Sequence, residues 1–247
     1  MTNDHSTQTI DSKHDGGAIA PLWHTTLVIL IILSVSALST ISSRRGSLAH
    51  NHLPSYVLTL AMEWLLAFFI VWGIRRNGIS LRQLLGDRPS GLRSWMQDFG
   101  LALVFWLFSF LVLGILGVVL QLAHAGSPQK AALALAPSTA VEVAVWIVLS
   151  ITAGICEELV FRGYLQQQFS ALSRRIGIGI LASSILFGAS HGYEGISGVV
   201  LITAYGAMFS ILAYRQRALR TCMMAHAFHD VFAGIVLAIL RSTHQIS

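Results

Sequence analysis

At the end of one long apolar run the chain carries Ile155-Cys156-Glu157-Glu158-Leu159-Val160-Phe161-Arg162. The run begins at Ala140 and is long enough for a helix to cross the hydrocarbon core of a bilayer. An ionisable side chain at the centre of such a helix costs about 2.5–3.5 kcal/mol on insertion scales, so it is usually retained for a function. Two adjacent glutamates therefore indicate a functional site inside a membrane.

The composition of the whole chain supports a membrane protein. Of the 247 residues, 54% are hydrophobic and 11% are charged, whereas an average soluble domain has about 25% charged residues. We predict an all-α fold, a polytopic transmembrane helical bundle. About seven spans are expected, with eight as the alternative count, and they lie at roughly 21–41, 53–74, 99–122, 139–161, 176–191, 199–214 and 221–240.

The segments between the spans are assigned from their polarity. Residues 1–20 have no apolar region like that of a signal peptide and are expected to form a disordered polar tail. Residues 21–247 are expected to form a single transmembrane domain. Short amphipathic pieces at the membrane surface are predicted within 75–98, and a short helix at 129–135. Glu63, in the second span, is expected to have a structural role.

The basic residues predict the orientation of the chain. With seven spans, twelve of the 16 Lys and Arg residues fall on the side that holds the N-terminus, which predicts that this side is cytoplasmic. Glu157 and Glu158 would then lie near the cytoplasmic end of their helix. We expect an integral protein of the plasma membrane in a bacterium-like cell. Nucleic acid is not an expected partner, because the basic residues occupy separate loops and form no patch.

The spacing around the two glutamates assigns them different roles. Successive residues of an α-helix point about 100° apart, so Glu157 and Glu158 face different directions. Glu158 and Arg162 are four residues apart and can form a salt bridge on one face. We assign Glu157 as the general base and the Glu158–Arg162 pair as its structural support; the reverse assignment stays open.

Two later spans bring histidines to a similar depth. His226 and Asp230 are four residues apart, so Asp230 is expected to hold the imidazole in one tautomer. His229 is interpreted as a neighbour of this pair. His191 follows Phe187 by four residues at the end of another span. Each histidine alone would indicate packing, but three helices that each carry such groups indicate one shared site.

These groups suit the activation of water against a carbonyl carbon. A glutamate takes a proton from water, one histidine positions that water, and the other donors stabilise the oxyanion. Glu157, His191 and His226 are also of the types that bind a divalent metal such as zinc. The sequence leaves both alternatives open, although the His-Glu-x-x-His motif of zinc proteases is absent.

At these residues the chain resembles the CPBP family, which comprises CAAX-protease and bacteriocin-processing membrane proteins (also called Abi proteins) and is similar to the type II CAAX prenyl protease. The resemblance rests on Glu157-Glu158-x-x-x-Arg162, Phe187-x-x-x-His191 and His226-x-x-x-Asp230, in this order on successive helices. It covers about residues 140–235. The first three spans are similar only in being hydrophobic.

The resemblance implies an intramembrane endopeptidase that acts on a peptide or a membrane-anchored protein. It implies that Glu157 activates water, that His191 helps to bind this water, and that His226 and Asp230 contact the oxyanion. Glu158 and Arg162 would support the site. Some members have Asn at the last position, and an ionised Asp cannot donate a hydrogen bond there. The family has been described both as metalloproteases and as glutamate proteases, so a zinc cofactor stays open.

Two rival functions are weighed against this one. Gly195-Ile196-Ser197-Gly198 followed by His226 matches the short motif of rhomboid serine proteases, but it leaves Glu157, Glu158 and Arg162 without a role. A transporter or a non-catalytic membrane scaffold would also carry ionisable residues in its spans. Against a transporter, the chain shows no internal repeat.

Overall fold

The computed structural model describes residues 17–44, 51–86, 89–124 and 135–244, which are helical and contain no strand. Within these ranges six helical segments are long and apolar enough to cross a membrane. They are α1 (Leu22–Arg44), α2 (Leu53–Arg76), α4 (Leu92–Leu122), the continuous segment 140–173, α9 (Gly195–Gln216) and α10 (Arg220–His244). The predicted all-α, polytopic membrane bundle is confirmed.

The fifth predicted span, 176–191, forms a shorter helix. This helix, α8 (Ile176–Ser190), has 15 residues, fewer than the roughly 20 that cross a bilayer without thinning it. A five-residue helix, α3 (Leu81–Leu85), and a single 3-10 turn, η3 (Gly192–Glu194), complete the described elements. The segment 92–98, predicted to lie at the surface, instead begins α4.

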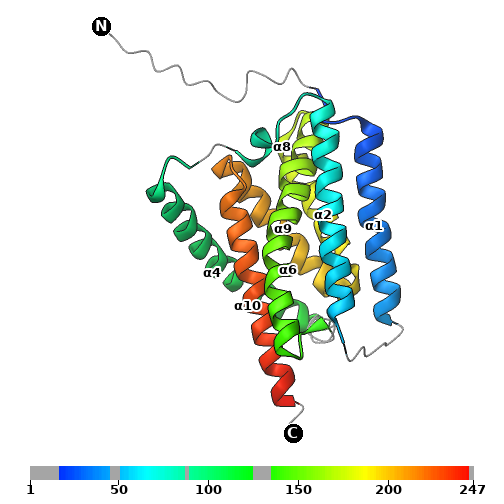
Figure 1. The fold of residues 1–247 in the computed structure, drawn as a ribbon, viewed down its shortest axis with the longest axis vertical. Coiled ribbons are helices and arrows are strands. Elements are labelled where there is room, and N and C mark those ends of the chain that lie inside the picture. Colours follow the sequence, from blue (N-terminus) through cyan, green and yellow to red (C-terminus); the bar gives the residue numbers. More distant parts are fainter. Residues whose placement is uncertain (1–16, 45–50, 87–88, 125–134, 245–247) are drawn as a thin grey trace.

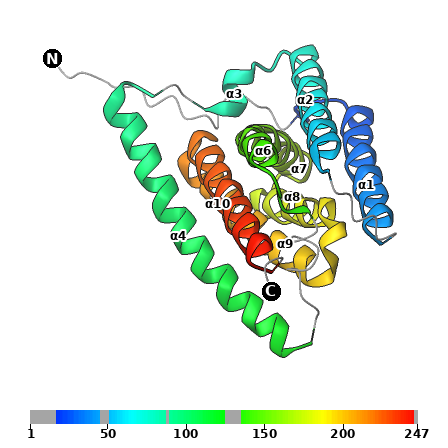
Figure 2. The same ribbon diagram turned by 60° about the horizontal axis from the view of Figure 1, so that its bottom comes forward.

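The segment 140–173 lies at the centre of the bundle. It comprises α6 (Ala140–Glu158), the π-helix η2 (Leu159–Leu165) and α7 (Gln166–Ser173). α6 packs against α2 and α10, whereas α8 packs against α7 and α9. Figure 1 shows α1 beside α2 at one edge, and Figure 2 shows α4 on the far side of α10. Most side chains of α4 face outward and are apolar, which suits contact with lipid.

Close contact between α6 and α10 depends on Gly154. A Cβ atom added there would lie 2.8 Å from the carbonyl oxygen of Met223 and 3.0 Å from the amide nitrogen of Ala227. The two backbones can approach this closely because glycine has no side chain, which is the usual device for tight helix packing in membranes. This contact lies one turn before Glu157 and Glu158.

A polar cluster, here called the end clamp, ties three helices together at one end of the bundle. Glu142 accepts hydrogen bonds from the amide of His52 and from the amide and hydroxyl of Ser138, each at 2.7 Å. Arg241 Nη1 lies 2.6 Å from the carbonyl oxygen of Ala136 and 3.1 Å from His52 Nε2. The start of α2, the start of α6 and the last part of α10 therefore meet at this end.

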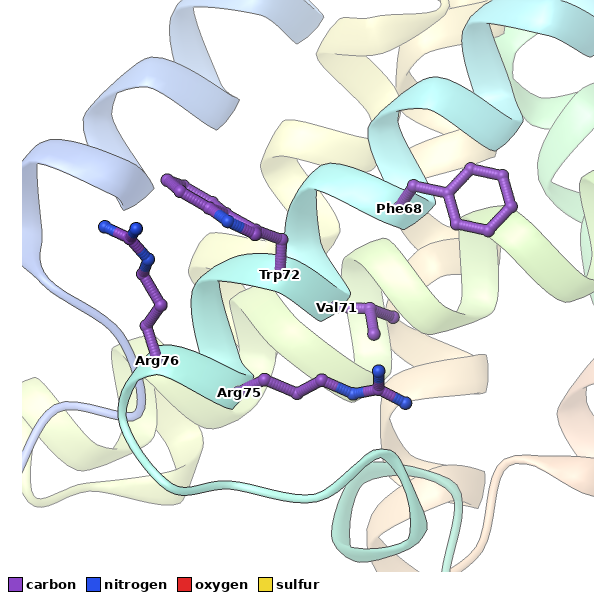
Figure 3. Close-up of a pocket in the computed structure, with 5 residues that line it drawn as sticks. All are labelled: Phe68, Val71, Trp72, Arg75 and Arg76. Atoms are coloured by element: carbon purple, nitrogen blue, oxygen red, sulfur yellow. The ribbon is translucent and has the colours of Figure 1, made fainter.

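The other end of α2 has the composition of a membrane interface. A hollow of about 360 Å³ on the outer face of this helix is lined by Phe68, Val71, Trp72, Arg75 and Arg76, as Figure 3 shows. The Arg76 guanidinium lies 4.5 Å from the centre of the Trp72 ring. Tryptophan and arginine gather where a span meets the headgroups. None of the predicted site residues lines this hollow. The cytoplasmic orientation of this end stays a prediction.

Two residues of the predicted polar tail, Ile19 and Ala20, pack against the bundle. Ile19 and Ala20 are buried, and the side chain of Gln168 binds their backbone through Ile19 N at 2.7 Å, Ala20 N at 3.1 Å and Ala20 O at 2.9 Å. A side-chain amide can do this because it offers the same donor and acceptor as a peptide group. Residues 1–16 and most of the predicted helix 129–135 lie outside the described ranges.

Candidate active site

The helix that carries the two glutamates does not end after them. The predicted span stops at Phe161, but η2 follows Glu158 directly and joins α7, so the helical segment has 34 residues. Glu157 and Glu158 are therefore the last two residues of α6, but they lie near the middle of the continuous helical segment. All seven residues of η2 are buried. π-Helical turns are rare and occur frequently at functional sites.

Glu158 and Arg162 form the ion pair that their spacing predicts. Arg162 Nη1 lies 2.8 Å from Glu158 Oε1, and neither side chain is exposed. The second terminal nitrogen of Arg162 donates to the carbonyl oxygen of Gly206 at 3.2 Å. Two charges without access to solvent need such partners, because an unpaired charge in this position would be strongly destabilising.

Aromatic rings surround the Arg162 guanidinium. Its central carbon lies 4.3 Å from the centre of the Phe187 ring and 5.1 Å from that of Phe209. Such cation–π contacts are strongest where water is excluded. A Cβ atom on Gly206 would lie 3.0 Å from Phe187 Cδ1, so this glycine leaves room for the ring. Gly206 and Phe209 could not be recognised as site residues from the sequence, because in an apolar span they look like ordinary packing residues.

His226 is held by Glu158 more closely than by Asp230. Its Nδ1 lies 2.8 Å from Glu158 Oε1, whereas its Nε2 lies 3.5 Å from Asp230 Oδ2 and 3.8 Å from Glu157 Oε2. The prediction that Asp230 fixes the imidazole is therefore corrected. The hydrogen bond joins α10 to α6, and it leaves Nε2 facing two carboxylates. The ring of His226 stacks on Phe209 at 5.4 Å.

His191 adjoins this group at the end of α8. Its Nδ1 lies 2.9 Å from the carbonyl oxygen of Phe187. Since a carbonyl only accepts hydrogen bonds, Nδ1 carries the hydrogen and Nε2 is the nitrogen available to another molecule. The Phe187 ring contacts the rings of both His191 and His226, with centroids at 5.1 and 6.0 Å. His191 is also within electrostatic range of Asp230.

The structure thus brings the six predicted site residues into one region. Glu157, Glu158 and Arg162 come from α6 and η2, His226 and Asp230 from α10, and His191 from the end of α8. His229 instead turns its ring toward Tyr205, with centroids 4.8 Å apart. Glu63 of α2 is a further carboxylate within electrostatic range of Glu157.

The arrangement does not match a zinc site as it stands. Among the side chains of the described ranges, no group of three His, Cys, Asp or Glu residues is placed to hold a metal ion. The predicted trio of Glu157, His191 and His226 would have to move to do so. A bound zinc would polarise a carbonyl or activate water. A role for zinc stays a prediction.

The rhomboid alternative finds no support in the geometry. Ser197 lies in the first turn of α9 and is buried. No described histidine forms a hydrogen bond with its hydroxyl. A serine nucleophile needs a base within hydrogen-bond reach, and Ser197 has none in this arrangement.

The segment that carries the candidate site also matches a known protein family. Residues 137–232 match the family model described as type II CAAX prenyl endopeptidase, Rce1-like. The matched segment contains all six predicted site residues. No curated protein and no solved structure matches the chain. The segment that forms the site of this integral membrane protein is therefore similar to the Rce1-like type II CAAX prenyl endopeptidases, and the resemblance predicted from the sequence is confirmed.

Proposed function

We propose that the protein is an intramembrane endopeptidase in which Glu157 activates the attacking water. One observation carries the proposal: two carboxylates face the same imidazole nitrogen. His226 Nε2 lies 3.8 Å from Glu157 Oε2 and 3.5 Å from Asp230 Oδ2. These distances exceed those of strong charge-assisted hydrogen bonds, so the polar atoms remain available to a water and a substrate. Glu157 Oε2 has no hydrogen-bond partner within the described part of the chain.

The proposed reaction begins with proton transfer from water to Glu157. The resulting hydroxide attacks the carbonyl carbon of the scissile peptide, and Glu157 then gives its proton to the leaving amine. His191 Nε2 is proposed to accept a hydrogen bond from the water and to orient it. Because Nδ1 of the same ring is occupied by the Phe187 carbonyl oxygen, this orientation is fixed.

His226 is proposed to stabilise the oxyanion of the tetrahedral intermediate. Its Nδ1–H donates to Glu158, so a doubly protonated ring can donate from Nε2 to the substrate oxygen. Glu158, Glu157 and Asp230 all lie near this ring and favour its charged form. In this proposal Asp230 supports the imidazolium and does not itself donate to the oxyanion.

The substrate is proposed to be a peptide or a membrane-anchored protein that is cleaved near the bilayer. CAAX processing, peptide maturation and bacteriocin self-immunity are the activities that the family resemblance suggests. A buried site between membrane helices suits a substrate that arrives with an apolar segment or a lipid group.

The first test is proteolysis of membrane-tethered peptides by the purified full-length protein in lipid nanodiscs. Matched peptides with and without a prenyl group should be compared for wild type, Glu157→Gln and Glu157→Asp. We expect Glu157→Gln to lower kcat by about 10²–10⁴-fold, which is the usual contribution of a general base. Glu157→Asp keeps the carboxylate and should retain part of the activity.

Chelation separates the two chemical alternatives. Cleavage that survives a strong chelator but is lost in Glu157→Gln supports the glutamate mechanism. Loss with chelator and recovery with zinc would replace it by a metalloprotease mechanism. Unchanged cleavage by Glu157→Gln would overturn the assignment of the base. If the protein cleaves no peptide but transports a solute, it is a transporter. If it cleaves no peptide but binds a partner protein, it is a scaffold.

A further inference from the structure

Two arginines at the end of α2 carry positive charge that no described carboxylate balances. Arg75 and Arg76 are the last residues of this helix, and both are exposed. Within the described ranges neither forms an ion pair. They are not needed to cap the helix either, because the carbonyl oxygens of Ile74 and Arg75 accept hydrogen bonds at 3.0 Å from the backbone amides of the turn that follows. Both guanidinium groups can therefore bind a ligand.

Arg76 lies along the outer face of α2 and not across its end. Its guanidinium is 4.5 Å from the centre of the Trp72 ring, about one turn earlier. Two other rings hold the Trp72 ring in place: it stacks on Phe69 with centroids 5.7 Å apart, and its edge contacts Trp23 of α1 at 6.2 Å. The attraction between a cation and an aromatic ring keeps the arginine over this face.

The two arginines border the hollow of about 360 Å³ on the outer face of α2. Figure 3 shows their guanidinium groups on opposite sides of the helix, and both side chains are extended. Since both are exposed and have rotatable bonds, they can close on a bound group. No acidic side chain lines the hollow. Its volume is within the range of about 300–1,000 Å³ that is usual for sites that bind small molecules.

The polarity of this face changes along α2 in the same order as the parts of a phospholipid. The charged end is followed by Trp72, which has the amphipathic ring found at headgroup depth. Phe68 and Leu65 come next and are 64% and 62% exposed. Positions 65, 68, 72 and 76 are three or four residues apart and so lie on one face of the helix. A guanidinium group pairs well with phosphate oxygens, and an acyl chain can lie along the two apolar side chains.

The charge of the hollow favours an anionic lipid. A zwitterionic lipid would bring a second cation beside its phosphate, and the two guanidinium groups would repel it. On the predicted orientation this end of α2 lies in the cytoplasmic leaflet. Anionic lipids give that leaflet a negative surface potential, which attracts clustered arginines.

We propose that the hollow on α2 binds the headgroup of an anionic glycerophospholipid. The phosphate pairs with Arg75 and Arg76, Trp72 lies at headgroup depth, and one acyl chain runs along Phe68. No residue of the proposed active site lines the hollow. The proposal therefore stands independently of the proposed function, and its test needs no proteolysis.

The test is native mass spectrometry of the full-length protein in detergent, titrated with short-chain phosphatidylglycerol or phosphatidylcholine. Wild type should bind phosphatidylglycerol more tightly. Each arginine near an anionic headgroup contributes about fivefold, so Arg75→Gln with Arg76→Gln should weaken the binding of phosphatidylglycerol by about 30-fold. The binding of phosphatidylcholine should change much less. A wild type that binds both lipids equally would overturn the proposal.

A second arginine pair provides the matched control. Arg174 and Arg175 are also adjacent and exposed, but they lie between α7 and α8 and do not line the hollow. Arg174→Gln with Arg175→Gln removes the same charge and should leave the affinity for phosphatidylglycerol unchanged. If this variant loses as much affinity as the first, binding depends on net charge alone and the hollow is not a site.

A second arm distinguishes a lipid from a free anion. Phe68→Gln should weaken the binding of phosphatidylglycerol because the acyl chain loses its apolar contact. Phe108→Gln is the control, since Phe108 is similarly exposed, at 57%, on α4. Inorganic phosphate at the lipid concentration should not displace the lipid. Displacement by phosphate, or an unchanged affinity in Phe68→Gln, would make the hollow an anion site and overturn the lipid assignment.

The same spectra detect a competing occupant, a second copy of the chain. A dimer that excludes phosphatidylglycerol and disappears in Phe68→Gln would assign this face to contact between two copies and overturn the proposal. Monomers that carry one tightly bound phosphatidylglycerol support it.

Discussion

Glu158 Oε1 accepts from His226 Nδ1 at 2.8 Å, and the same oxygen accepts from Arg162 Nη1 at 2.8 Å. One carboxylate oxygen thus links the π-helix η2 to helix α10. Through this atom the position of the imidazole depends on an arginine that the substrate does not need to touch. Glu158 and Arg162 are therefore positioning residues in the proposed mechanism.

Glu158→Gln should lower both stability and turnover. The amide is nearly isosteric, but it leaves the buried Arg162 charge without its counter-charge, which typically costs about 3–5 kcal/mol. Thermal unfolding in detergent should detect the loss of stability, and the fall in kcat should exceed any change in KM. Unchanged stability would mean that Arg162 finds another counter-charge.

Replacing both members of the ion pair should separate their structural and catalytic roles. Apolar residues of similar size often substitute for a buried ion pair without loss of stability. We expect Glu158→Leu with Arg162→Met to be more stable than either single variant and still inactive, because His226 then lacks its partner. Thermal unfolding of the four proteins of the cycle gives the coupling energy. Recovery of activity in the double variant would contradict the positioning role.

Gly154→Ala should weaken the contact between α6 and α10. The added methyl group would lie 2.8 Å from a backbone oxygen that cannot rotate away, and overpacking of this kind costs about 1–3 kcal/mol. Gly117→Ala on α4 is the matched control, since nothing lies within 4 Å of a Cβ there. Unfolding midpoints should differ between these two variants, and equal midpoints would show that the helices separate easily.

His52 should make stability depend on pH. Burial lowers its pKa, Glu142 partly offsets this, and the Arg241 cation lowers the pKa further. Because the folded-state pKa is below the unfolded value of about 6.5, the unfolded chain binds more protons. The contribution of His52 is therefore complete above that value and is lost as pH falls through the folded-state pKa.

The measurement for His52 is the thermal midpoint between about pH 7.5 and pH 5, a range that brackets the ordinary histidine pKa. Wild type should lose more stability on acidification than His52→Gln, whose side chain does not titrate. A variant with the same pH dependence as wild type would assign the effect to other groups.

Much of the bundle could be predicted because the length of an apolar run in the sequence is enough to predict a membrane span. The spans that became α1, α2, α9 and α10 agree with the structure to within a few residues. The four-residue spacing of Glu158 and Arg162 also predicts their ion pair, since side chains four residues apart lie on one face of a helix. Both features depend only on local sequence.

What could not be predicted depends on contacts between helices. The hydrogen bond from His226 to Glu158 needs the relative depth of α10 and α6, and no spacing within one helix encodes this. The π-helix has no clear signal in an apolar run. Gly206 and Phe209 gain their roles only because Arg162 lies between α8 and α9.

The end clamp also sets how the helices can separate. His52, Glu142 and Arg241 give α2, α6 and α10 a common fixed point at one membrane surface. Helices tied at one end diverge by rotation about that end, so the gap between them widens with distance from it. A polypeptide that reaches Glu157 through such a gap enters from the opposite surface, which on the predicted orientation is the cytoplasmic one.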